Sequence, residues 1–200
     1  MFSTRARAAV IGVLFLCMAS AAEAQWGIAA GIRAPRFSGG AAESGTGRSL
    51  MPYRPTMWEV TLERMGARAG VGLRLNYASS SLALEGPDAL AAVKDALEVY
   101  GIDPEVSLRL RRLGVGGLLR IYAGPLLEVW RLPDTPSEWR LGFAASLGLE
   151  VPFGERWAGT ARVGAAVLPT SPFTESNLDP SFEPEALWRR EVSASLLYRW

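Results

Sequence analysis

Residues 188–200, which read WRREVSASLLYRW, decide the fold class of this chain. Every second residue belongs to a mostly aromatic or aliphatic series: Trp188, Arg190, Val192, Ala194, Leu196, Tyr198 and Trp200. The residues between them form a mostly polar series: Arg189, Glu191, Ser193, Ser195, Leu197 and Arg199. Because successive side chains of a strand point to opposite faces, this alternation predicts a β-strand with one apolar and one polar face.

The same alternation recurs along the chain and predicts eight strands, near 25–34, 55–65, 67–79, 104–112, 116–131, 137–152, 155–169 and 186–200. Tight turns separate three pairs of strands, at Met65-Gly66, Leu113-Gly114-Val115 and Phe153-Gly154. Longer connections occupy 35–54, 80–103, 132–136 and 170–185. Because long and short connections alternate strictly, the sequence predicts an all-β fold, an eight-stranded antiparallel up-and-down barrel with its long loops at one end.

One part of the second long connection allows two interpretations. Residues 88–97, DALAAVKDAL, contain good helix formers, and Asp88 could cap a helix. This segment is therefore either a short helix on the barrel rim or a strand that continues beyond the membrane.

The first 24 residues have the three parts of a secretory signal peptide. Arg5 and Arg7 give a positive start, residues 8–18 are uncharged and mostly apolar, and Ala22-Glu23-Ala24 fits a cleavage site. The apolar run is shorter than the roughly 20 residues that a membrane-spanning helix needs. We therefore expect a secreted precursor with a signal peptide over 1–24 and a barrel domain over 25–200.

The composition of the two faces separates a membrane barrel from a soluble one. A soluble barrel keeps its apolar side chains inside, whereas a membrane barrel turns them toward lipid. The polar faces carry glycine, alanine, serine and well-spaced charges, as in strand 137–152 with Arg140, Gly142, Ala144, Ser146, Gly148 and Glu150. Small residues and single charges suit the narrow lumen of an eight-stranded barrel. This favours a transmembrane barrel, with a soluble secreted barrel that binds an apolar ligand as the alternative.

The aromatic residues of the apolar faces lie at strand ends. We expect two aromatic girdles, with Val, Leu, Ile and Ala between them. The girdle residues are Trp26, Trp58, Tyr77, Trp139, Phe153, Trp157, Trp188, Tyr198 and Trp200.

The charges of the polar faces predict a network inside the barrel. Ten arginines and five glutamates fall on these faces: Arg33, Glu59, Glu63, Arg68, Arg74, Arg109, Arg111, Arg120, Glu128, Arg140, Glu150, Arg162, Arg189, Glu191 and Arg199. Because unpaired charge is costly in a narrow lumen, we expect the acids to bridge several arginines and close the barrel. The excess of arginine leaves a second hypothesis open, a small anion-preferring pore or transporter.

The mature chain resembles the small eight-stranded outer-membrane barrels, the OmpA/OmpX-like class. The resemblance covers the whole barrel region and is sharpest at the C-terminus, where Val192, Ala194, Leu196, Tyr198 and Trp200 look like the terminal strand of this class. The usual last residue is Phe, and Trp200 keeps the aromatic character. The resemblance implies a location in the bacterial outer membrane, contact with its lipids, and recognition of the last strand by the barrel-assembly machinery. It implies no single function.

The composition argues against several function classes. The chain has no histidine, and its one cysteine, Cys17, lies in the predicted signal peptide. This removes the commonest general base and metal ligand, so we expect no enzyme, no cofactor and no metal site. Glu59 and Glu63 have the spacing of an acid pair, but they are better explained as partners of lumenal arginines. Removing Arg5, Arg7 and Glu23 leaves 19 basic and 19 acidic residues, which argues against a nucleic-acid partner.

The outer loops are the remaining candidate interaction surface. The fourth loop, residues 170–185, carries several acids and two aromatic residues: Glu175, Asp179, Glu183, Glu185, Phe173 and Phe182. Such a loop could bind a surface partner or could be an ordinary solvated loop. The sequence therefore favours a structural or surface-interaction protein of the outer membrane.

Overall fold

The structure is a computed structural model that describes residues 24–86, 90–114, 116–133, 135–174 and 180–200. It contains the strands β1 (Gln25–Ser38), β2 (Ala41–Glu43), β3 (Ser49–Tyr53), β4 (Met57–Met65), β5 (Ala69–Glu85), β6 (Leu90–Arg112), β7 (Leu118–Arg131), β8 (Glu138–Pro152), β9 (Trp157–Leu168), β10 (Phe182–Pro184) and β11 (Leu187–Arg199). Within this part of the chain, no helix has the length and hydropathy to cross a membrane. The predicted signal peptide lies outside the described residues, except for Ala24.

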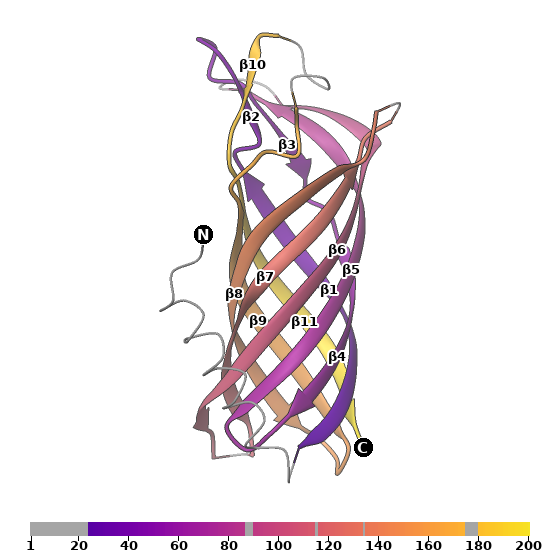
Figure 1. Cartoon of the computed structure of the whole chain (residues 1–200), viewed down its shortest axis with the longest axis vertical. Helices are drawn as coiled ribbons and strands as arrows, with labels where there is room; N and C mark the ends of the chain where they lie inside the picture. The colour runs from indigo at the N-terminus through magenta and orange to yellow at the C-terminus, as the bar shows by residue number, and fades with distance from the viewer. Residues whose placement is uncertain (1–23, 87–89, 115, 134, 175–179) are drawn as a thin grey trace, which may run out of the picture.

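Eight of the strands close into an antiparallel barrel (Figure 1). The order is β1-β4-β5-β6-β7-β8-β9-β11, and β11 returns to pair with β1. Each barrel strand therefore pairs with its neighbour along the chain, and no edge is left open. The predicted all-β, eight-stranded up-and-down barrel is confirmed.

The three tight turns lie at one end of the barrel, and the second long connection differs from the prediction. Residues 66–68, 113–117 and 153–156 join the paired strands at the short-turn end. Most of 80–103 is strand, because β5 and β6 continue pairing as far as Glu85 and Leu90. Residues 90–97 are therefore extended strand, and the helix interpretation is wrong. The β-bulge between Ser80 and Leu82 bends this long hairpin.

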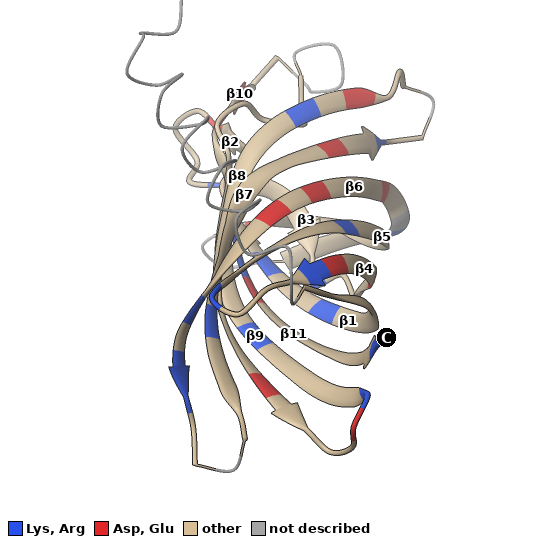
Figure 2. Ribbon diagram, turned by 60° about the horizontal axis from the view of Figure 1, so that its bottom comes forward, with Lys and Arg blue, Asp and Glu red and all other residues tan. Residues whose placement is uncertain are grey.

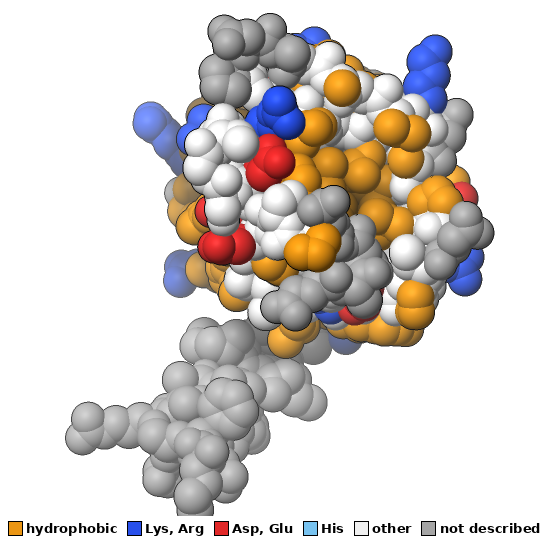
Figure 3. Space-filling model, turned by 90° about the horizontal axis from the view of Figure 1, so that it is seen from above, with side chains coloured by type: hydrophobic (Ala, Val, Ile, Leu, Met, Phe, Trp, Pro, Cys, Tyr) orange, Lys and Arg blue, Asp and Glu red, His pale blue; other side chains and the backbone are white. Residues whose placement is uncertain are grey.

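The first and fourth loops are paired with each other at the other end of the barrel. Strand β2 pairs with β3 on one side and with β10 on the other. The Ser171 hydroxyl donates to the Gly40 carbonyl at 2.5 Å, and the Ser44 hydroxyl donates to Glu183 at 2.9 Å. Phe173 is fully buried in this region. The loop end is thus a small sheet with its own packing, and hydrophobic side chains gather over its middle (Figure 3).

The exterior of the barrel is apolar. Val163 and Val192, which face each other across β9 and β11, are both 57% exposed. Large aliphatic residues are exposed on every barrel strand, whereas twelve of the described charged residues are buried at positions that face inward. A soluble barrel needs the opposite arrangement. The soluble secreted alternative is therefore wrong.

An apolar layer fills the lumen toward the loop end, which the sequence interpretation did not include. Trp130 and Leu126 are fully buried, Leu97 is buried beside them, and Phe37 packs edge-on against Trp130 with ring centroids 6.0 Å apart. A smaller cluster of Ala29, Ala158 and Leu197 lies near the short-turn end. Most of the buried charges thus lie below the Trp130 layer, and Arg199 and Glu63 lie beyond the small cluster, nearer the short-turn end.

Candidate functional site

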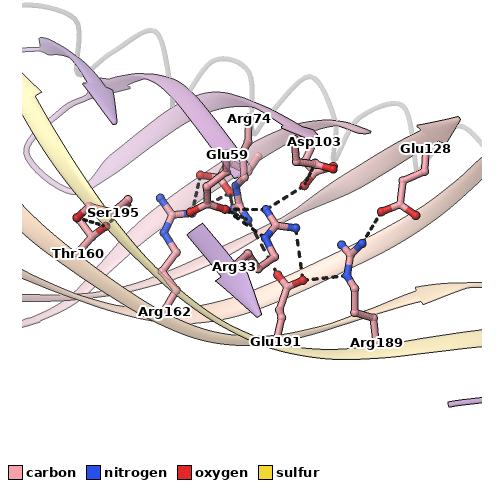
Figure 4. A network of polar contacts seen from close by, with 12 residues as sticks. Arg33, Glu59, Arg74, Asp103, Glu128, Thr160, Arg162, Arg189, Glu191 and Ser195 are labelled. Atoms are coloured by element: carbon pink, nitrogen blue, oxygen red, sulfur yellow. Dashed lines mark hydrogen bonds and ion pairs between the residues drawn. The ribbon is translucent and has the colours of Figure 1, made fainter. Parts of the chain in front are cut away.

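Arg33 is the centre of a buried charge network in the barrel lumen (Figure 4). The alternation of β1 points its side chain inward, where its guanidinium contacts three acids from three other strands. It lies 2.9 Å from Glu59 on β4, 3.5 Å from Asp103 on β6 and 3.3 Å from Glu191 on β11. One arginine therefore ties strands on both sides of β1 to the opposite wall.

A second group forms around Glu105 on β6. Its carboxylate pairs with Arg74 and lies 2.9 Å from Arg162. Arg162 also lies over the ring of Tyr122, 3.6 Å from its centroid. Arg74 extends to within 3.9 Å of Glu59, so this group is continuous with the contacts of Arg33.

A third group leads toward the loop end. Arg189 pairs with Glu128 and lies 2.8 Å from Glu191. Glu128 is fully buried and accepts a hydrogen bond of 3.1 Å from the indole of Trp130. The network therefore joins the apolar layer through a satisfied polar contact.

A fourth group lies near the short-turn end. Arg199 donates two hydrogen bonds of 2.7 Å to the Glu150 carboxylate and lies 3.6 Å from Glu63. Arg120 lies 3.5 Å from Glu150. Such bidentate contacts are among the stronger hydrogen bonds in proteins.

The paired lumenal charges nearly balance. The ion pairs among the described residues join six arginines to seven acids: Arg33, Arg74, Arg120, Arg162, Arg189 and Arg199 to Glu59, Glu63, Asp103, Glu105, Glu128, Glu150 and Glu191. Figure 2 shows the charged positions distributed over the strands. The expected excess of arginine is absent from this network.

Four of the predicted arginines lie away from the network. Arg68 is exposed in the turn between β4 and β5, and Arg109 is half-buried near the same end. A β-bulge between Arg109 and Arg111 shifts the register, so that Arg111 lies opposite the outward-facing Leu119. Arg140 lies near the loop end, where it pairs with Glu138 at 3.0 Å and donates to the carbonyl of Ser171. These side chains lie near the two ends of the barrel, away from its centre.

The sequence interpretation missed two acids of the network, Asp103 and Glu105. Glu105 lies two residues before Ser107, which is buried on β6. Alternation along the predicted strand therefore indicates that the Glu105 side chain also points inward. Asp103 fell in the predicted connection 80–103, because the next strand was expected to begin at Pro104. In the structure both acids are part of strand β6.

The network leaves little free space. The lumenal cavity beside Arg74, Asp103, Glu105 and Tyr122 has a volume of about 10 Å³. That volume holds at most about one water molecule. No group of His, Cys, Asp or Glu that could hold a metal ion occurs among the described residues. The arrangement suits a rigid plug of ion pairs.

Most of the predicted girdle residues lie on the outer surface at the ends of strands or in the turn after β8. Tyr77 lies in the middle of β5, because this strand continues as far as Glu85. Seven of the predicted girdle residues are at least 43% exposed: Trp26, Trp58, Trp139, Phe153, Trp157, Trp188 and Trp200. At the short-turn end Trp157 and Tyr198 are 4.9 Å apart, and at the loop end Tyr77 packs on Tyr100 at 5.0 Å. Tyr100 adds an aromatic residue to the predicted loop-end belt.

The fold is similar to solved structures of small outer-membrane barrels. Neisserial surface protein A matches with a TM-score of 0.62 at 8% identity, covering 88% of this chain and 97% of that one. OprG from Pseudomonas aeruginosa matches at 0.53 and 12%, covering 89% and 96%. The outer membrane protein AlkL, studied in DMPC bilayers, matches at 0.52 and 11%, covering 89% and 90%. No protein-family model and no curated protein matches the sequence.

The likeness shows the fold, and the surface of this chain shows the environment that the fold requires. The chain has the fold of the small eight-stranded outer-membrane barrels. Its exterior is a mostly apolar wall, and the charges of its ion-pair network are buried in the lumen. Such a wall is stable in contact with lipid, but in water it would cause the protein to aggregate. The protein is therefore a transmembrane barrel of the outer membrane.

Proposed function

We propose that this protein is a structural or surface-interaction protein of the outer membrane, with a lumen closed by Arg/Glu pairs and no catalytic role. The observation that carries the proposal is the contact of Arg33 with acids from three strands. A side chain held by three partners cannot leave the lumen axis without exposing buried charge. The apolar layer around Trp130 adds a second closure above it.

Conductance tests this proposal against the anion-preferring pore. The purified barrel is inserted into planar bilayers and single-channel currents are recorded. We expect no steps above the background of protein-free bilayers. As a matched control, the double variant Arg33→Ala/Glu59→Ala removes two network side chains and should increase conductance if the assay detects lumenal opening. Regular steps with anion preference in the unmodified protein would replace our proposal with the pore.

We further propose that the loop end is the interaction surface. Strand β10 and the adjoining loop are held against β2 and Gly40, so the surface has a defined shape before any partner arrives. Preorganisation of this kind lowers the entropic cost of binding. The acids Glu175 and Asp179 of the fourth loop lie outside the described residues, whereas Glu183 is held by Ser44.

A loop replacement tests this surface. Residues 171–184 are replaced by a short Gly/Ser turn, and binding of outer-membrane vesicles to a panel of host and bacterial surface extracts is measured. We expect loss of binding with an unchanged heat-dependent shift of the barrel on electrophoresis. The control replaces the short turn 153–156 at the other end. Equal binding by both replacements would remove the loop end as the surface.

The last strand is the proposed contact for the barrel-assembly machinery. On β11 the outward series Val192, Ala194, Leu196 and Tyr198 continues to Trp200, whose backbone N–H donates to the Trp26 carbonyl at 3.1 Å. We expect Trp200→Ala to lower the amount of folded barrel in the outer membrane and Trp200→Phe to preserve it.

A further inference from the structure

A crevice opens in the barrel wall where β1 leaves β4. The two strands pair from Gln25–Met65 up to Arg33–Met57, and beyond this point β3 pairs with β5 instead. The upper part of β1 and strand β3 are therefore neighbours without a ladder between them. The space between them has a volume of about 400 Å³ and is lined by Arg36, Phe37, Met51, Pro52, Tyr53, Arg54, Glu85, Gly86 and Leu90.

Two arginines lie directly opposite each other beside this crevice. Arg36 on β1 is the cross-strand partner of Arg190 on β11, and both are exposed on the outer face of the barrel. Like charges at directly opposed positions destabilise an antiparallel pair. Among the described residues neither forms an ion pair, and Arg36 donates only to the adjacent Pro35 carbonyl, at 2.8 Å.

Arg54 lines the crevice together with Arg36, whereas Arg190 lies beside it. Arg54 lies over the ring of Tyr53, 5.2 Å from its centroid, and has a positive φ of 47°. Glu85 also lines the crevice, but within the described chain it forms no ion pair with Arg36 or Arg54. Among the described residues, no carboxylate therefore lies within ion-pair distance of Arg36, Arg54 or Arg190, and Glu85 is the one acid among the lining residues.

We propose that this crevice binds the phosphate headgroup of a lipid of the outer leaflet. The guanidinium forks of Arg36, Arg54 and Arg190 suit a phosphate, which offers several acceptor oxygens at once. A bound phosphate also removes the repulsion between Arg36 and Arg190. This proposal rests on the location of the barrel and is independent of the proposed closure of the lumen.

The surroundings indicate a lipid more than a free anion. Phe37 and Met51 give the crevice an apolar lining. The exposed Trp188 on β11 lies two positions from Arg190 and marks the aromatic belt at this end. An occupant with an acidic head and apolar chains would cover both kinds of surface.

Lipid selectivity tests the proposal. The full barrel is reconstituted in phosphatidylcholine vesicles, and the association of spin-labelled phosphatidic acid is compared with that of spin-labelled phosphatidylcholine. We expect about a tenfold preference for phosphatidic acid, the ratio that corresponds to about 1.4 kcal/mol. The variant Arg36→Gln/Arg54→Gln/Arg190→Gln should reduce the preference to near unity.

The matched control uses arginines at the other end. Arg64 lies 5.8 Å from the ring of Trp26, and Arg156 donates to the Tyr198 hydroxyl at 3.2 Å. The variant Arg64→Gln/Arg156→Gln should retain most of the preference. A loss of preference in this control but not in the crevice variant would overturn the proposal. Displacement of the lipid by about 10 mM inorganic phosphate would also overturn it, because the site would then take the anion without the chains.

Discussion

The Arg33 side chain shows how a charge can be retained inside a membrane barrel. Burial of an isolated guanidinium is very costly, and attraction between buried ions offsets that cost only when the geometry is good. Arg33 meets this condition with three carboxylates, each of which contacts at least one further group. Removal of a single member therefore leaves several uncompensated charges.

The variant Arg33→Met should destabilise the barrel by about 3–5 kcal/mol, because Glu59, Asp103 and Glu191 lose a shared partner. The measurement is urea unfolding in lipid vesicles, followed by tryptophan fluorescence. Arg68→Gln is the control, since Arg68 is exposed in a turn and should change the free energy of unfolding by less than about 0.5 kcal/mol. Equal effects of the two substitutions would show that the network does not stabilise the fold.

Strands β6 and β7 contain an interruption that sequence periodicity does not reveal. The pairs Ile102–Leu127 and Val106–Ala123 share one register, which places Pro104 directly opposite Pro125. Neither proline has a backbone N–H, so the ladder lacks its hydrogen bonds at this point. A Cβ atom on Gly124 would overlap the Pro104 carbonyl, so glycine permits the close approach.

The double variant Pro104→Ala/Pro125→Ala should complete the ladder between β6 and β7. The two new amides should exchange slowly with deuterium, as we also expect for those of the paired Ile102 and Leu127, because each gains a carbonyl acceptor across the strands. Amide exchange measured by NMR in nanodiscs checks this result. Exchange of the new amides at rates typical of exposed loops would contradict it. Pro152→Ala, at the end of β8, is the control outside the interruption.

The strand positions show what the sequence could and could not predict. The tight turns and the inward parity of residues such as Arg33, Glu59 and Arg189 follow from alternation, a local property. The bulge that turns Arg111 outward and the continuation of β6 through 90–103 depend on pairing with neighbouring strands. Because Gly101 and Pro104 are tolerated within a paired strand, their loop-like composition was misleading at this position.

At the scale of the whole molecule, apolar and charged groups occupy different levels of the lumen along the barrel axis. Across the wall, apolar side chains face outward and the paired charges face inward. Ion pairs fill the middle of the lumen below the Trp130 cluster at the loop end, and the small cluster around Leu197 lies next to the Arg199 group at the short-turn end. The apolar layers exclude water from the ion pairs and thereby strengthen them. The apolar outer wall is stable in contact with lipid. The charges in the lumen are stable because they are paired with one another.

Because the outer wall is apolar, a charge introduced on it should cost more stability in a bilayer than on a surface in water. Val163 lies near the middle of β9, faces outward and is 57% exposed. In a bilayer, Val163→Arg should cost about 2–4 kcal/mol, because it places a charge in the hydrocarbon. On a soluble surface the same change would be nearly neutral. Urea unfolding in vesicles measures the cost, with Val163→Leu as the control for side-chain volume and Val93→Arg, on the part of β6 beyond the loop-end belt, as the control for charge. If Val163→Arg were as stable as Val93→Arg, the outer wall would not lie in the hydrocarbon, and the membrane-spanning arrangement of the barrel would have to be rejected.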